Sequence, residues 1–107
     1  MKIRSKATNI EMTDAIRDHF QEKMDMLDKY LGKIDVINCD VEVEKLAGDQ
    51  HKGKIYRAEV NLQVPKEILR VVKDAEDMYK AIDKVKDHLE LVIKKYKDKL
   101  EDRRRGR

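Results

Sequence analysis

The side chains that most often carry out catalysis are few in this sequence and lie far apart. The one cysteine, Cys39, and the one serine, Ser5, both fall in runs where the residue character alternates. A cysteine in such a run is typical of a small buried side chain, not of a nucleophile. The histidines His19, His51 and His88 have no second His or Cys at the spacing of a metal site. We therefore predict no enzyme, no metal site and no cofactor; an enzyme would have to rely on Cys39 and His51.

Three carboxylates stand close together at Asp74, Glu76 and Asp77, and such a group invites a cation-site interpretation. Carboxylates at the start of a helix, however, accept hydrogen bonds from its free amides and oppose its dipole. This role accounts for all three residues without a metal. We interpret them as the beginning of a helix that is capped by Asp74.

A basic stripe on that helix is the clearest sign of a binding function. Over residues 74–100, apolar side chains recur at spacings of three and four, as in an amphipathic helix. The opposite side carries Lys80, Lys84, His88, Lys94 and Lys95. Asp87 and Asp98 interrupt the stripe and Leu91 projects among its lysines, so an ordinary solvated surface is the alternative interpretation.

The distribution of charge favours a functional stripe. From Lys80 to the end the chain has eleven Lys or Arg against six Asp or Glu, whereas residues 1–79 have fourteen against sixteen. The formal net charge of +3 therefore combines a basic end with a slightly acidic body. A local basic field of this kind is typical of a protein that meets phosphate groups on one surface.

The bulk properties indicate one folded domain. The chain has 107 residues, of which 40% are hydrophobic and 44% charged. Its single cysteine excludes an internal disulfide, and no apolar run approaches the roughly 18 residues that span a bilayer. We expect a cytoplasmic protein with no membrane partner and no small-molecule substrate.

Six periodic segments must position these side chains. Alternation predicts strands over 2–7, 36–45, 54–64 and 68–72, with Ile37 and Cys39 among the inward residues, and helical spacing predicts helices over 13–31 and 74–100. Residues 47–53 are polar with glycine near both ends, and Pro65 begins a second tight turn. Thr13 is the expected N-cap of the first helix, and Gly32 is its expected end.

The order of these segments predicts the fold. A strand, helix and strand in sequence form a right-handed crossover with parallel strands, and the two hairpins add antiparallel strands. Each helix has one apolar stripe and each long strand one apolar side. We therefore predict an α+β, β-α-β-β-β-α two-layer sandwich with a four-stranded sheet and both helices on one face. The other face carries charges of both signs: Lys2, Arg4, Lys6, Glu42, Glu44, Arg57, Glu59 and Arg70.

Several motifs resemble one known family. The runs Asp-Met-Tyr-Lys-Ala-Ile-Asp over 77–83 and Lys-Lys-Tyr-Lys-Asp-Lys-Leu over 94–100 are similar to the last helix of the ribosome hibernation promoting factors, also called protein Y or ribosome-associated inhibitor. Residues 9–17, Lys23 and Leu-Asp-Lys-Tyr over 27–30 resemble their first helix, and Val-Glu-Val-Glu-Lys over 41–45 resembles their second strand.

The resemblance implies both a fold and a function. The fold is like that of double-stranded RNA-binding domains, which agrees with the predicted order of elements. Proteins of this family bind the small ribosomal subunit, on 16S rRNA and neighbouring ribosomal proteins near the decoding region. There they block mRNA and tRNA binding during stress or stationary phase, without catalysis.

The resemblance also implies which residues meet rRNA phosphates. On the last helix these are the basic positions Lys80, Lys84, Lys94, Lys95, Lys97 and Lys99. Lys23 and Lys45 match basic family positions, and the strand pattern adds Arg4 and Lys6. The family commonly has Lys-Leu-x-Arg-Gln where this chain has His-Leu-Glu-Leu-Val over 88–92. Without that arginine, binding here rests more on Lys94 and Lys95, and Leu91 is free to touch a base, a sugar or a ribosomal protein.

The resemblance leaves the extent of the protein and its partners open. We expect a ribosome-binding domain over 1–101 and a basic, disordered tail or the start of a linker over 102–107. Longer family members carry a C-terminal domain that pairs ribosomes, so ribosome dimerisation is expected only if such a domain is missing from this chain. The alternative function is a non-ribosomal, basic protein-interaction module.

Overall fold

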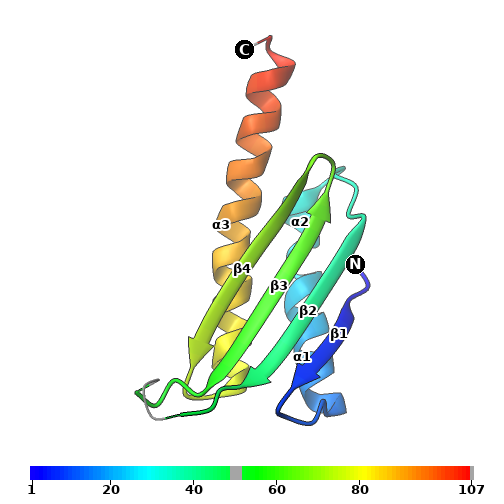
Figure 1. The fold of residues 1–107 in the computed structure, drawn as a ribbon. Coiled ribbons are helices and arrows are strands. Elements are labelled where there is room, and N and C mark those ends of the chain that lie inside the picture. The colour runs from blue at the N-terminus through cyan, green and yellow to red at the C-terminus, as the bar shows by residue number, and fades with distance from the viewer. Residues whose placement is uncertain (49–51, 107) are drawn as a thin grey trace.

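The fold is a single sheet with helices on one face (Figure 1). The computed structural model describes residues 1–48 and 52–106. Its elements are β1 (Arg4–Thr8), α1 (Asp14–Asp25), α2 (Asp28–Leu31), β2 (Asn38–Lys45), β3 (Tyr56–Val64), β4 (Glu67–Ala75) and α3 (Met78–Arg104). The predicted α+β sandwich is confirmed.

The strands lie in the order β1-β2-β3-β4, and this order leaves β1 and β4 at the two edges. β1 runs parallel to β2 because the helical segment α1–α2 connects them, and both hairpins are antiparallel. The register places Cys39, Val41 and Val43 of β2 opposite Leu62, Val60 and Ala58 of β3. These side chains are all buried, so the alternation in the sequence identifies the inner face of the sheet correctly.

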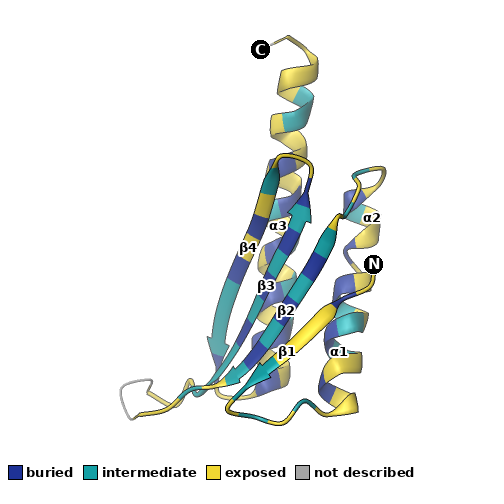
Figure 2. Ribbon diagram, turned by 45° about the vertical axis from the view of Figure 1, so that its right-hand side comes forward, coloured by how far each residue is buried: buried dark blue, intermediate teal, exposed yellow. Residues whose placement is uncertain are grey.

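The core lies between this inner face and the helices. α3 packs on β3 and β4 and also touches α1 and α2, and its buried residues all lie on the side that faces the sheet (Figure 2). Phe20 and Met24 of α1 belong to the same buried cluster as Leu89 and Ile93 of α3. The end of α3 projects beyond the sheet (Figure 1), which gives the molecule its 50 Å long dimension.

The last helix begins later than predicted, and the strand before it is longer. β4 continues to Ala75 because Asp74 lies opposite Arg57 of β3, whose guanidinium donates hydrogen bonds of 2.7 and 3.0 Å to the Asp74 carboxylate. α3 starts at Met78, and the N-cap is Asp77, which accepts a hydrogen bond from the Tyr79 amide. The prediction that Asp74 caps this helix is therefore wrong.

The first predicted helix consists of two helices. Thr13 caps α1 as predicted by accepting a hydrogen bond from the Ile16 amide, but the helix ends at Asp25. The short α2 follows and ends at Gly32, whose φ of 60° suits glycine. Leu27 and Leu31 are buried in spite of the break, so the predicted apolar stripe is preserved.

Two further positions differ from the sequence predictions. Ile37 was expected to face the core but is 54% exposed, because it lies ahead of the β2 ladder that begins at Asn38. α3 extends to Arg104, so residues 102–104 are helical. His51 lies outside the described residues.

Candidate functional site

The two sides of α3 that border its buried stripe have different neighbours. One side faces α1 and α2, and most of its charged groups are in ion pairs; we call it the paired flank, with Asp83, Lys86, Glu90 and Lys94 as its residues. The other side faces the edge strand β4. We call it the open flank, and it consists of Lys84, His88 and Lys95 on α3 together with Lys54 and Lys73 beside them.

Carboxylates hold the lysines of the paired flank. The Lys94 ammonium lies 3.2 Å from a Glu90 carboxylate oxygen and 5.0 Å from the centre of the Tyr30 ring. The hydrogen bond from Lys94 lowers the pKa of the Glu90 carboxyl, so this carboxylate remains charged well into the acid range. Lys86 lies 3.5 Å from both Glu90 and Asp87.

Lysines near both ends of α3 are also held by groups of the protein. Near the start of the helix, Lys80 pairs with Glu76 at 3.2 Å. Toward the end, Lys97 donates to the Tyr30 carbonyl oxygen at 2.8 Å, which ties α3 to α2. Lys80, Lys94 and Lys97 are predicted phosphate contacts, and each already has a polar partner within the protein.

A cluster between α1 and α3 holds another predicted contact. His19 Nε2 lies 2.8 Å from Asp83 Oδ1, and the Lys23 ammonium lies 3.6 Å from the same oxygen. The His19 ring also meets the edge of the Tyr79 ring, with centroids 5.0 Å apart. Lys23 is only 23% exposed along its side chain, so it serves the contact between the helices.

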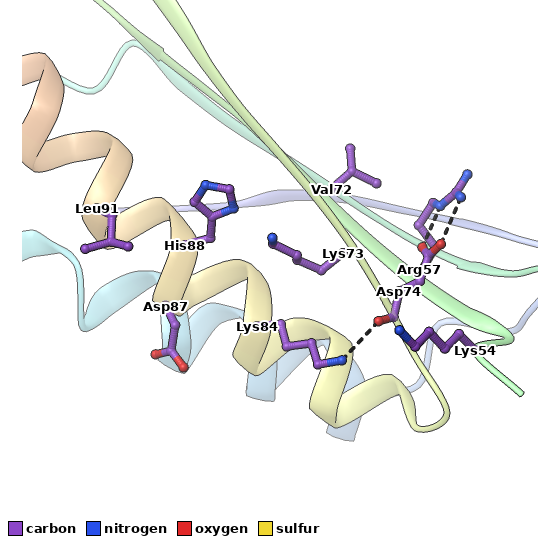
Figure 3. Close-up of a pocket in the computed structure, with 9 residues that line it drawn as sticks. All are labelled: Lys54, Arg57, Val72, Lys73, Asp74, Lys84, Asp87, His88 and Leu91. Carbon is purple, nitrogen blue, oxygen red and sulfur yellow. Dashed lines mark hydrogen bonds and ion pairs between the residues drawn. The ribbon is translucent and has the colours of Figure 1, made fainter.

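The open flank borders a groove of about 980 Å³ between α3 and β4 (Figure 3). Its lining combines Lys54, Lys73, Lys84 and His88 with Arg57, Asp74, Asp87, Val72 and Leu91. The Lys84 ammonium donates to the Asp74 carbonyl oxygen at 3.3 Å, which holds it at the rim of the groove. In residues 1–48 and 52–106, no carboxylate lies within ion-pair distance of Lys54, Lys73 or Lys84.

The open flank continues along α3 past this groove. Lys95 lies beside Val92 and Leu69 in a smaller hollow of about 280 Å³. Lys99, in the same hollow, pairs with Glu67 of β4 at 2.8 Å. Lys95 has no ion-pair partner among the described residues, so it extends the unmatched charge of Lys84 along the helix.

Lys54 and Lys73 are the two members of the open flank that the sequence analysis did not identify. Lys73 belongs to the inward series of β4 with Leu69, Val71 and Ala75, which are buried. Because β4 is the edge strand, the side chain of Lys73 lies beside α3, whereas those of Leu69 and Val71 are buried under it. Continuing the alternation past Val72 would have identified Lys73 as a neighbour of α3.

Most of the cations on the outer face of the sheet form salt bridges with carboxylates of neighbouring strands. Arg4 pairs with Asp40, its partner in the register, and donates a hydrogen bond of 2.8 Å to Oδ2. This hydrogen bond lowers the pKa of the Asp40 carboxyl. Arg70 lies 3.3 Å from Glu59. Of the remaining predicted contacts, Lys6 is exposed on this face and Lys45 is exposed at the end of β2.

Cys39, one of the two residues on which an enzyme would rely, lies in the core. Cys39 is buried, and this burial raises the pKa of its thiol to about 12, so the thiol is protonated at neutral pH. No three His, Cys, Asp or Glu side chains of the described residues gather into a group that could bind a metal. Within the same residues, no helix is both long and apolar enough to cross a membrane.

Comparisons with known proteins agree with this fold. The chain is 33% identical over 100 residues to the ribosome hibernation promotion factor of Deinococcus radiodurans, an alignment of 92% of this chain and 51% of that protein. It is 34% identical over 104 residues to the factor of Lactococcus lactis, covering 94% of this chain and 51% of the relative. The chain thus spans about half the length of these two relatives. For the factor of Azotobacter vinelandii the identity is 32% over 106 residues, covering 99% of this chain and 92% of the relative.

A solved structure and a family model support the same assignment. The N-terminal domain of Thermus thermophilus Protein Y superposes with a TM-score of 0.75 at 35% identity, covering 90% of this chain and 99% of that one. The family model described as sigma 54 modulation protein / S30EA ribosomal protein matches residues 2–101. The resemblance that the motifs carry is thereby confirmed, and the chain belongs to the sigma 54 modulation protein / S30EA ribosomal protein family, the family of the ribosome hibernation promoting factors.

Proposed function

We propose that this protein is a ribosome hibernation factor that binds the small ribosomal subunit near the decoding region and blocks mRNA and tRNA binding by occupying their space. The observation that carries the proposal is the open flank, where one rigid helix presents unmatched lysines. Relatives named as ribosome hibernation factors supply the identity of the partner. The site of action would be the cytoplasm, where the ribosomes are.

Binding would depend mainly on charge. RNA phosphates carry condensed counterions, and each protein cation that neutralises a phosphate releases one of them into solution. A lysine that already pairs with a carboxylate contributes less, because the internal pair must be opened or shared before the ammonium can neutralise phosphate. We therefore rank the predicted contacts by whether a carboxylate already pairs with them: unpaired lysines come first.

Lys84 and Lys95 are therefore our first choices for rRNA contact, together with Lys54 and Lys73. The other predicted residues follow, since each has an internal partner or stands apart from the groove: Lys80, Lys94, Lys97, Lys99, Lys23, Lys45, Arg4 and Lys6. Inhibition would be steric, with no bond made or broken. The long α3 suits this role, because the part of it that packs on β3 and β4 is held by the sheet and resists displacement.

Cosedimentation with purified small subunits tests the proposal. We expect binding at low salt and a steep, linear fall of log K with log salt concentration, with a slope of about −0.7 to −0.9 per neutralised phosphate. Preloading the subunits with mRNA and initiator tRNA should reduce binding by competition.

The opposite results would contradict the proposal. Binding that ignores mRNA and tRNA would place the protein elsewhere on the ribosome. No binding to small subunits at low salt, together with capture of a protein partner from nuclease-treated lysate, would favour the protein-interaction module.

A further inference from the structure

The groove between α3 and β4 has two chemically different ends. Figure 3 shows Leu91 and His88 at one end and Lys54 at the other, with Lys73 between them. Leu91 is 61% exposed and lines the groove beside His88, so its aliphatic side chain is open to a ligand. The groove therefore offers an apolar wall with an imidazole beside it, followed by a cluster of ammonium groups.

The carboxylates in the lining do not cancel this positive charge. Asp74 is held by the two hydrogen bonds from Arg57, and Asp87 lies 3.5 Å from the Lys86 ammonium. Lys54, Lys73 and Lys84 remain as the cations of the lining that form no ion pair with a carboxylate in the described part of the chain. An anionic ligand would meet attraction at this end of the groove.

A single nucleotide matches the two ends of the groove, since it has an apolar surface at one end and a negative charge at the other. Its base has an apolar face that packs on aliphatic or aromatic side chains, and its phosphate lies a few ångströms away and seeks cations. A base inside a duplex is covered by its neighbours, so duplex RNA would use the lysines and leave Leu91 in water. The exposed leucine next to the lysines thus favours an unpaired nucleotide over a double helix.

We propose that this groove binds one unstacked nucleotide of single-stranded RNA, with its base against Leu91 and His88 and its phosphates on Lys73, Lys84 and Lys54. That the partner is RNA rests on the proposed function; the contact between the protein and a base is the new element. It makes Leu91 a determinant of affinity that salt does not screen. The lysines supply the part of the affinity that salt does screen.

The test compares two single-stranded 12-mers with the same number of phosphates. One is oligoadenylate and the other has an abasic sugar at every position, and fluorescence anisotropy at low salt reports the affinity of each. We expect oligoadenylate to bind about three- to tenfold tighter, because only it can bury a base on the groove wall. Leu91→Ala should remove most of this difference and leave the salt slope unchanged.

A matched control is available on the same molecule. Ile68 is also 61% exposed, but it lies on the outer face of β4 and does not line this groove. Ile68→Ala removes an equally exposed aliphatic side chain and should preserve the preference for oligoadenylate. Both variants should unfold at the wild-type temperature, because neither side chain is buried.

Three outcomes would overturn the inference. The first is equal affinity for the two oligonucleotides, or no binding of oligoadenylate. The second is a preference that Leu91→Ala leaves intact. The third is a twelve-residue oligoglutamate that binds as tightly as oligoadenylate, which would assign the groove to acidic peptides. If small subunits still bind the wild-type protein, these outcomes reject the nucleotide contact and leave the proposed function standing.

Discussion

The paired flank and the open flank each take two lysines from α3, but these lysines have different surroundings. Lys94 has Glu90 four residues before it on the helix, and Asp83 receives His19 and Lys23 from α1. Lys84 and Lys95 face the edge strand β4, and Lys73 of this strand shares the groove with Lys84. The number of basic residues on a helix is therefore a poor guide to its binding surface, because neighbouring carboxylates determine which charges are available to a ligand.

The largest expected effect comes from reversing two unpaired charges and, separately, two paired ones. Lys84→Glu with Lys95→Glu should weaken binding to small subunits by roughly 100-fold at moderate salt, because two phosphate contacts become repulsions. Lys80→Glu with Lys94→Glu makes the same change in net charge at two lysines that already pair with Glu76 and Glu90. We expect it to cost about tenfold or less, since those lysines are already partly neutralised.

Cosedimentation of both double variants with small subunits measures this difference, and circular dichroism checks that each is folded. Equal losses would show that only total charge matters. A larger loss in Lys80→Glu with Lys94→Glu would reverse the ranking of paired and unpaired lysines.

A smaller effect is expected from Lys73→Gln, which removes one open-flank charge that is not on α3. We expect the slope of log K against log salt to become shallower by about 0.7 to 0.9 and the affinity to fall by about three- to tenfold. A salt titration of the variant beside the wild-type protein gives both quantities. An unchanged slope would show that Lys73 does not neutralise a phosphate, so that β4 is not part of the interface and only α3 is.

Glu90→Gln should convert part of the paired flank into an open one. The glutamine keeps the size of the side chain but frees Lys94 and Lys86 from their shared carboxylate. We expect a gain of about two- to threefold in affinity for small subunits, with a steeper salt slope. Isothermal titration calorimetry at two salt concentrations measures both. A loss of affinity would mean that Glu90 positions Lys94 for contact instead of neutralising it.

The outer face of the sheet should be the least sensitive surface. Arg4→Gln should leave binding to small subunits unchanged, because Arg4 already donates two hydrogen bonds to Asp40. The effect should appear in the acid titration of the protein. Arg4 lowers the pKa of Asp40, so the stabilising pair is present at neutral pH and is lost as the pH falls through that lowered value.

In Arg4→Gln, the pKa of the Asp40 carboxyl should return toward its ordinary value, which carboxyl-detected NMR measures directly. An unchanged pKa would show that another group holds this carboxylate. A loss of ribosome binding would add the outer face to the interface.

Most of the fold could be predicted from the sequence, because alternation and helical spacing depend on local side chains. The buried series on β2, β3 and α3 and the parallel crossover all follow from these patterns. The start of α3 could not be predicted in this way. Asp74 and Asp77 are both good helix caps, and only the register with β3 reveals that Arg57 takes Asp74 into the sheet.

The candidate site could be predicted only in part. Helical spacing places Lys84, Leu91 and Lys95 on the outside of α3, and the structure agrees. The division into two flanks depends on which elements pack on each side of the helix. Lys73 belongs to a strand, not to α3, and shares the groove with Lys84 only because β4 is the edge strand beside α3.

The central claim is that the open flank places this protein in the path of mRNA and tRNA. In vitro translation at low ionic strength, with protein in excess over ribosomes, tests it most directly. We expect strong inhibition by the wild-type protein and by Lys80→Glu with Lys94→Glu, but little inhibition by Lys84→Glu with Lys95→Glu. Full-speed translation with the wild-type protein, or equal inhibition by both double variants, would contradict the claim.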